Sequence, residues 1–110
     1  MLKRNQKQPQ PLTPIEYAVS VTGNKWKLLI LHTLMSRALP WHIPELVQAV
    51  RGIDQTVLKV TLQSMEKDGL IVSVVHKDLP PRVEFSLSEQ GESLRPLLHA
   101  LEEWGKAHGH

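Results

Sequence analysis

Apolar residues recur along the chain with two periods, and the change of period separates a helical part from an extended part. Between residues 13 and 68 they recur every three or four positions, as on helices with one buried face. Capping residues, prolines and glycines limit these helices to about 13–21, 25–39, 44–51 and 55–68. The second helix is apolar on most of its surface, so we expect it at the centre of the domain.

After the fourth helix the period falls to two, which is typical of β-strands. Residues 70–77 are rich in valine and isoleucine, and residues 82–88 alternate polar and apolar side chains. Pro80 and Pro81 lie between these segments and have no N–H to donate to a strand pair. We therefore predict a two-stranded hairpin with a rigid tip.

A last helix is predicted over 89–106, beginning after Ser88 and kinked at Pro96. This order of four helices, a hairpin and a closing helix is typical of the winged helix-turn-helix, a mainly α fold with a small β-hairpin. A short turn around Gly52 joins the third and fourth helices, as in helix pairs that read DNA. A small helical domain with a hairpin and no nucleic-acid role fits the same pattern.

Length and charge refine this picture without deciding it. The 110 residues fit one domain over 13–106, with a flexible basic arm over 1–12 and a tail over 107–110. The net charge is +2, but the first ten residues contain three cations and no acid, which leaves −1 for the rest. A body so close to neutral permits DNA binding without arguing for it. There is no apolar run of about 18 residues, so we expect no membrane partner.

No residue pattern in the sequence indicates catalysis or metal binding. The chain has no glycine-rich phosphate loop and no nucleophile elbow, so we expect no enzyme and no catalytic residue. Cysteine is absent, and the six histidines are spread over different elements without helical ligand spacing. We therefore expect no metal site and no cofactor.

Three segments and one aromatic residue carry a resemblance that covers residues 13–104. The segments are GNKWKLLILHTLM, GIDQTVLKVTLQSMEKDGLI and PPRVEFSLSEQGESLRPLL, and the aromatic residue is Trp104. Together they resemble the HxlR-type transcriptional regulators, bacterial winged-helix proteins related to the MarR group. The resemblance implies a cytoplasmic, nucleoid-associated homodimer that binds a palindromic operator in double-stranded DNA as a repressor or activator. It indicates no particular effector.

The sequence departs from the family at positions that serve redox sensing or DNA contact in other members. Thr13 stands where many members have a cysteine, so redox sensing is not implied for this chain. Trp41 and His42 replace the usual Arg-Phe pair before the third helix. Basic residues common in the family are also missing from the fourth helix and, at Ser73, from the first strand. An interaction module with weak or no DNA binding is therefore the alternative function.

If the fourth helix enters a major groove, the face opposite Leu58, Leu62 and Met65 must meet the bases. Glutamine can pair with adenine, lysine can donate to guanine, and threonine or valine can contact a thymine methyl group. The alternative for this face is an ordinary solvated helix surface. The predicted DNA-reading residues are Gln55, Thr56, Lys59, Val60 and Gln63.

Cations at two other places are candidate phosphate contacts. Lys77 and Arg82 flank the hairpin tip, although Arg82 could instead pair with an acid such as Glu84 on the same strand face. Lys25 and Lys27 begin the second helix, where free N–H groups also attract anions, although both fit solvated surface lysines equally well.

A leucine-rich stripe on the last helix is the candidate dimer surface. The second helix already provides a core, so a further long stripe is better explained by a second copy of the chain. Packing on its own domain is the alternative. The predicted interface residues are Ile15, Tyr17, Leu94, Leu97, Leu98, Leu101 and Trp104.

Overall fold

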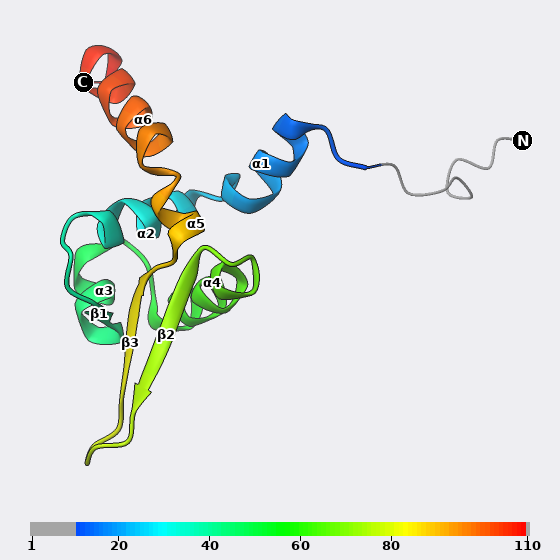
Figure 1. Cartoon of the computed structure of the whole chain (residues 1–110). Coiled ribbons are helices and arrows are strands. Elements are labelled where there is room, and N and C mark those ends of the chain that lie inside the picture. Colours follow the sequence, from blue (N-terminus) through cyan, green and yellow to red (C-terminus); the bar gives the residue numbers. More distant parts are fainter. Residues whose placement is uncertain (1–10, 110) are drawn as a thin grey trace, which may run out of the picture.

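The computed structural model describes residues 11–109, and most of the predicted basic arm lies outside them. The described part has the predicted winged helix-turn-helix fold, with six helices and three strands (Figure 1). The elements are α1 (Pro14–Thr22), α2 (Lys25–Met35), β1 (Trp41–His42), α3 (Ile43–Ala49), α4 (Gln55–Lys67), β2 (Ile71–His76), β3 (Arg82–Leu87), α5 (Glu89–Glu92) and α6 (Arg95–His108).

Capping side chains start the helices where the sequence placed them. Thr13 and Glu16 form a reciprocal capping box at α1, and the Asn24 side chain accepts from the backbone N–H groups of Trp26 and Lys27 at α2. The Asp54 carboxylate accepts from the Val57 N–H at 2.8 Å and begins α4. These caps satisfy N–H groups that would otherwise have no partner at a helix N-terminus.

The sheet has one strand more than predicted. Its order is β1-β3-β2, and both pairs are antiparallel, with Trp41 opposite Phe85 and Ile71 opposite Leu87. The pair β2–β3 is the predicted hairpin, which forms the wing. Strand β1 has only two residues, too few to show any period in the sequence, and it forms because β3 offers it a free edge.

The predicted limits of two helices are wrong. The last helix is not one kinked helix but two: α5 ends at Glu92, and Pro96 lies in the first turn of α6, where its missing N–H is not needed. Helix α2 ends at Met35, four residues before the predicted end at residue 39. The chain therefore reaches Pro40 in a loop. Helix α6 extends two residues beyond the predicted end at 106.

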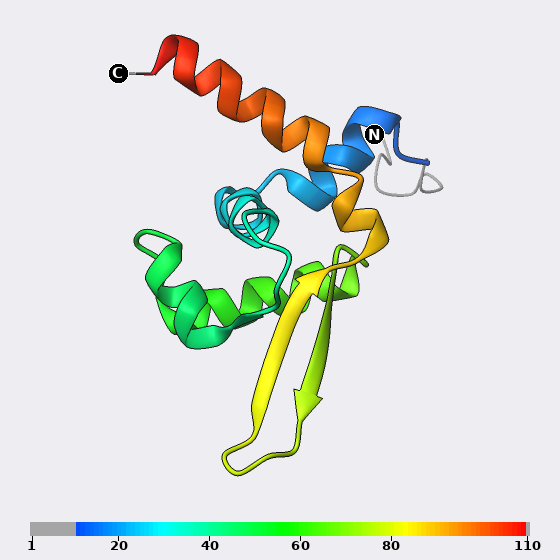
Figure 2. The same cartoon turned by 60° about the vertical axis from the view of Figure 1, so that its left-hand side comes forward.

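The hydrophobic core lies between the central helices and the base of the sheet. The fully buried side chains come from α2, α3, α4 and the start of β2, and they include Ile30, Leu31, Leu46, Leu58 and Met65. The wing and α6 extend from opposite ends of this body (Figures 1 and 2). The fold therefore has two well-separated ends, each with its own exposed surface.

Candidate nucleic-acid interface

Helix α4 is held by its inner face and exposes its outer one. Leu58, Thr61, Leu62 and Met65 are buried against the core. The turn from α3 passes through Gly52, whose φ of +84° is a left-handed conformation that glycine adopts without strain. The packing thus fixes which side of α4 faces the solvent.

The outer face of α4 carries all of the residues predicted to read DNA. Every one of them is exposed, and none of their side chains forms a hydrogen bond or ion pair within the described residues. Their donors, acceptors and methyl groups are therefore free to contact another molecule. These residues are Gln55, Thr56, Lys59, Val60 and Gln63.

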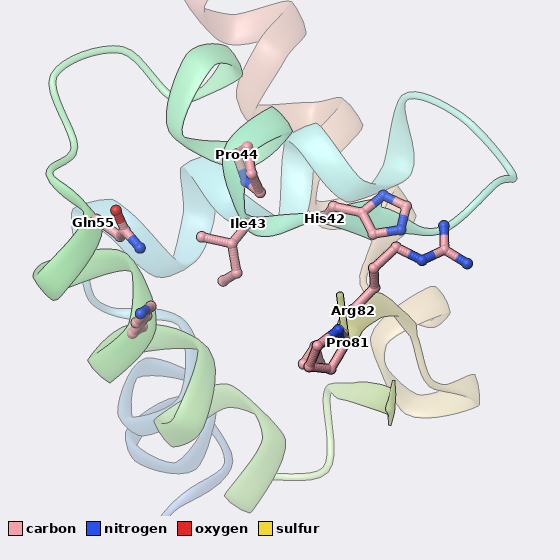
Figure 3. A pocket seen from close by; sticks show the side chains of 8 residues that line it. His42, Ile43, Pro44, Gln55, Pro81 and Arg82 are labelled. Atoms are coloured by element: carbon pink, nitrogen blue, oxygen red, sulfur yellow. The ribbon is translucent and has the colours of Figure 1, made fainter. Parts of the chain in front are cut away.

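A groove of about 540 Å³ connects α4 with the wing (Figure 3). Gln55 on α4, Ile43 and Pro44 at the start of α3, and Pro81 and Arg82 on the wing surround it. Its lining is mostly apolar, although four of the lining residues have polar or charged side chains. The remaining lining residues are His42, Lys59 and Val83.

The two cations that flank the wing tip differ in their surroundings. Lys77 is exposed and has no ion-pair partner within residues 11–109. Arg82 donates to Asp78 across the turn at 3.1 Å and does not pair with Glu84, the partner considered from the sequence. Glu84 does lie on the same strand face as Arg82, but the turn brings Asp78 closer to the guanidinium group.

The two lysines of α2 also differ in their surroundings. The Lys25 ammonium group lies 4.5 Å from the centre of the Trp26 ring and is exposed. The Lys27 ammonium group lies 3.5 Å from the Asp68 carboxylate at the end of α4, and its side chain is only 14% exposed. Lys27 therefore ties α2 to α4, which leaves Lys25 as the α2 lysine open to a phosphate.

The leucines of α6 do not form a single interface stripe. Leu98 is 5% exposed and belongs to the core, and Leu94 packs against that core. Leu98 therefore has almost no surface left for a partner, while the predicted partner contact of Leu94 stays a prediction. Leu97, Leu101 and Trp104 are exposed, with Trp104 at 65%, and Leu101 also lines a hollow with Leu98 and with Leu28 and Leu29 of α2.

Helix α1 adds further exposed apolar side chains. Ile15 is exposed, as is Val19 one turn later, which the sequence analysis did not include. Tyr17 is half-exposed, and its hydroxyl accepts from the Gln90 side chain at 3.3 Å. We call the exposed residues Ile15, Tyr17, Val19, Leu97, Leu101 and Trp104 the α1–α6 apolar face.

Comparison with known proteins decides the family. The model of the HxlR-like helix-turn-helix family matches residues 21–110. The chain belongs to this family. An HTH-type transcriptional regulator of Methanothermobacter thermautotrophicus is 43% identical over 98 residues, which are 89% of this chain and 73% of the relative.

Solved structures of HxlR-like and MarR-type regulators have the same fold. The HTH-type regulator YtcD, a Bacillus subtilis protein, superposes with a TM-score of 0.81 at 36% identity, over 88% of this chain and 97% of that one. The redox regulator HypR in its reduced form superposes with a TM-score of 0.80 at 30% identity, over 86% and 92%. This chain is thus a transcriptional regulator with a helix-turn-helix DNA-binding fold, and its relatives imply a non-enzymatic role.

This HxlR-like chain also contains a charge network that the sequence analysis missed. The Glu45 carboxylate accepts from Arg37 at 2.8 Å and from the His42 backbone N–H at 2.9 Å. These contacts, the Arg37 one above all, lower the pKa of Glu45 to about 2. A hydrogen bond with the His76 ring at 2.8 Å likewise lowers the pKa of Glu84.

The network joins the wing to the helix-turn-helix body. The two ring nitrogens of His42 lie 3.2 Å from Glu45 and 3.4 Å from Glu84, so the imidazole lies between α3 and β3. Pairing of β1 with β3 puts His42 opposite Glu84. No sequence signal marks this contact, because it depends on a two-residue strand.

Metal and membrane signals are absent from the part of the chain that the structure describes. Its histidines and acids form no group of three that could hold a metal ion. No helix between residues 11 and 109 is long and apolar enough to span a membrane.

Proposed function

We propose that the protein is a homodimer that binds a palindromic operator in double-stranded DNA. In this proposal α4 of each subunit enters a major groove and the wing contacts the flanking backbone. One observation carries it: the free outer face of α4 continues through the groove to the wing, at the end of the molecule away from α6 (Figures 1 and 3). A duplex bound there would leave the α1–α6 apolar face for a second subunit.

The outer face of α4 has the chemistry for reading base edges. An amide such as that of Gln55 or Gln63 can both donate to and accept from adenine in the major groove. Lys59 can donate to guanine, and Val60 can contact a thymine methyl group. The candidate phosphate contacts are Lys77, Arg82 and Lys25. Lys27 is not among them, because it pairs with Asp68 and its side chain is only 14% exposed, against 49% for Arg82.

The exposed apolar residues at the other end support the proposed dimer. Side chains as large as Ile15, Leu101 and Trp104 rarely remain in water together on a monomer. A two-fold symmetric pairing would bury them and present two copies of α4 on one surface. Two such helices about one turn of DNA apart would require a palindromic site.

A salt titration tests whether the protein binds DNA through backbone charges. Purified protein selects duplexes from fragmented genomic DNA, and the dissociation constant for a retained palindrome is measured between 50 and 200 mM salt, a range in which phosphate contacts give a steep slope. We expect a steep loss of affinity as salt rises. A flat slope would contradict the proposal.

The role of Lys59 is tested with a matched lysine. Lys59→Ala should weaken operator binding by about tenfold per half-site, since a lysine contact to a base accounts for roughly 1–3 kcal/mol. Lys106→Ala removes the same charge from α6, where Lys106 pairs with Glu103, and should leave DNA binding unchanged. Equal effects of the two substitutions would show that α4 is not the reading helix.

A protein-interaction dimer with weak or no DNA binding is the second candidate. The charge outside the first ten residues is −1, and Lys27 and Arg82 are already paired with acids, which favours this candidate. It predicts that no palindrome is retained from the genomic fragments even at 50 mM salt, where phosphate contacts are strongest.

A further inference from the structure

The tip of the wing exposes a large apolar side chain almost completely. Leu79 is 97% exposed, more than any other large hydrophobic residue between positions 11 and 109. Leu39, the next, is 72% exposed and lies in the loop after α2. A single exposed leucine is common on protein surfaces. Leu79 differs from such residues because it lies on a rigid turn beside the surface proposed to bind DNA.

The turn holds Leu79 at its apex. Asp78 and Arg82 pair across the turn at 3.1 Å, so the three residues between them form a closed loop. Two of these are Pro80 and Pro81, whose rings fix φ and leave little backbone freedom. A side chain presented on such a rigid loop loses little entropy when it is buried by a ligand.

The apex adjoins the surface proposed to bind DNA. Pro81 and Arg82 line the groove that leads to Gln55 and Lys59 on α4. Lys77 and Arg82 flank the apex with positive charge, opposed by Asp78. The tip lies at the far end of the molecule from α6, so a subunit docked on the α1–α6 apolar face would not cover Leu79 (Figures 1 and 2).

We infer that Leu79 inserts into the minor groove beside each half-site and partly separates two stacked base pairs. The inference rests on the proposed function, because it requires α4 in the adjacent major groove. Apolar wedges flanked by cations act in this way on DNA: the wedge enters between base steps while the cations meet phosphates. The ligand of Leu79 is therefore a deformable base step, while the flanking Lys77 and Arg82 contact phosphates.

This role adds sequence preference at a position that α4 does not touch. Pyrimidine–purine steps such as TA unstack easily, whereas A-tracts are stiff. The operator should therefore favour a TA step under each wing tip over an A-tract. The preference should depend on the Leu79 side chain alone.

The test uses a palindrome selected by the wild-type protein, with either a TA step or an A-tract under the wing tip as located by footprinting. 2-Aminopurine beside that step reports unstacking by its fluorescence. Leu79→Ser should weaken binding to the TA duplex by about tenfold, lose the fluorescence increase and lose the TA preference. The salt slope should not change, because no phosphate contact is removed.

Two matched variants separate the wedge from other effects. Leu79→Met keeps a large apolar side chain and should behave as the wild type does. Leu39→Ser makes the same polar change at an exposed leucine outside the wing and should also have no effect. Both Leu79 and Leu39 are surface residues, so neither substitution disturbs the core.

The outcomes distinguish the two proposals. If the wild type binds with a steep salt slope but Leu79→Ser keeps the affinity, the fluorescence change and the TA preference, the wedge is wrong and the proposed function stands. If Leu79→Ser loses affinity equally for both duplexes with no fluorescence change in the wild type, the tip makes no wedge. If the wild type retains no duplex at low salt, both proposals fail.

Discussion

Helices α4 and α6 have almost the same length, 13 and 14 residues, and each has an apolar and a polar side, yet they relate to the core in opposite ways. Helix α4 buries four residues and exposes a mainly polar face. Helix α6 buries only Leu98 and exposes Leu97, Leu101 and Trp104. A single subunit thus completes the packing of α4 but not that of α6.

The difference indicates what each end of the molecule is suited to contact. An outer face with free amides and an ammonium group suits a polar, hydrated ligand such as the major groove of DNA. A helix with exposed leucine and tryptophan suits a dry protein contact. In the proposed dimer, α4 and the wing would therefore bind DNA, and α1 and α6 would pair the subunits.

The largest expected effect comes from placing charge on the exposed side of α6. The double variant Leu101→Glu/Trp104→Glu should weaken self-association at least about 100-fold, because four buried apolar side chains per dimer are replaced by carboxylates. Binding to a palindrome should fall with it. Sedimentation velocity measures the first effect and fluorescence anisotropy the second.

The control for this double variant changes charge by the same amount on the other side of α6. Lys106 lies opposite Leu97 on the helix and is exposed, so Lys106→Glu should leave the dimer intact. If both variants are monomeric, net charge and not the apolar face controls association.

The next largest expected effect is a difference in stability between alanine substitutions at Leu98 and at its neighbour Leu97. In the monomeric double variant, Leu98→Ala should lower the free energy of unfolding by about 2–4 kcal/mol, because it leaves a cavity in the core. Leu97→Ala in the same background should cost less than about 0.5 kcal/mol, as is usual at the surface. Urea unfolding measures both. Similar losses would show that α6 does not have one inward and one outward side.

The smallest expected effect is a loss of thermal stability at low pH, caused by protonation of Glu45 on α3. The pKa of Glu45 is lowered from about 4.5 to about 2, so its ionised form stabilises the folded state above pH 4.5 and this contribution is lost as the pH falls to 2. Glu45→Gln removes the titration. Its melting temperature should therefore fall less than that of the wild type between pH 4.5 and 2. Parallel curves would contradict the role of this pair.

Local patterns account for most of the fold and less of the site. The helices after Thr13, Asn24 and Asp54 and the hairpin were predictable, because caps and periods are written in neighbouring residues. Strand β1 was not, since it depends on pairing with residues more than 40 positions away. The His42 and Glu45 network was missed with it.

The same limit applies to α6 and the wing. Leu97 and Leu98 are adjacent on a broad apolar stripe, and only packing against the core decides which of them is buried. Arg82 shares a strand face with Glu84, but the turn geometry that brings Asp78 closer is not encoded in strand alternation. Exposure of the α4 face, by contrast, followed directly from its helical period.

The distance between the two α4 helices in the dimer tests the central claim most directly. Because the chain has no cysteine, Gln63→Cys provides a single attachment point on the exposed face of α4 for a spin label. Double electron–electron resonance on the labelled protein should give one distance near about 34 Å, the spacing of successive major grooves on one side of a duplex. The absence of a dipolar coupling, or a distance about twice as long, would contradict the account.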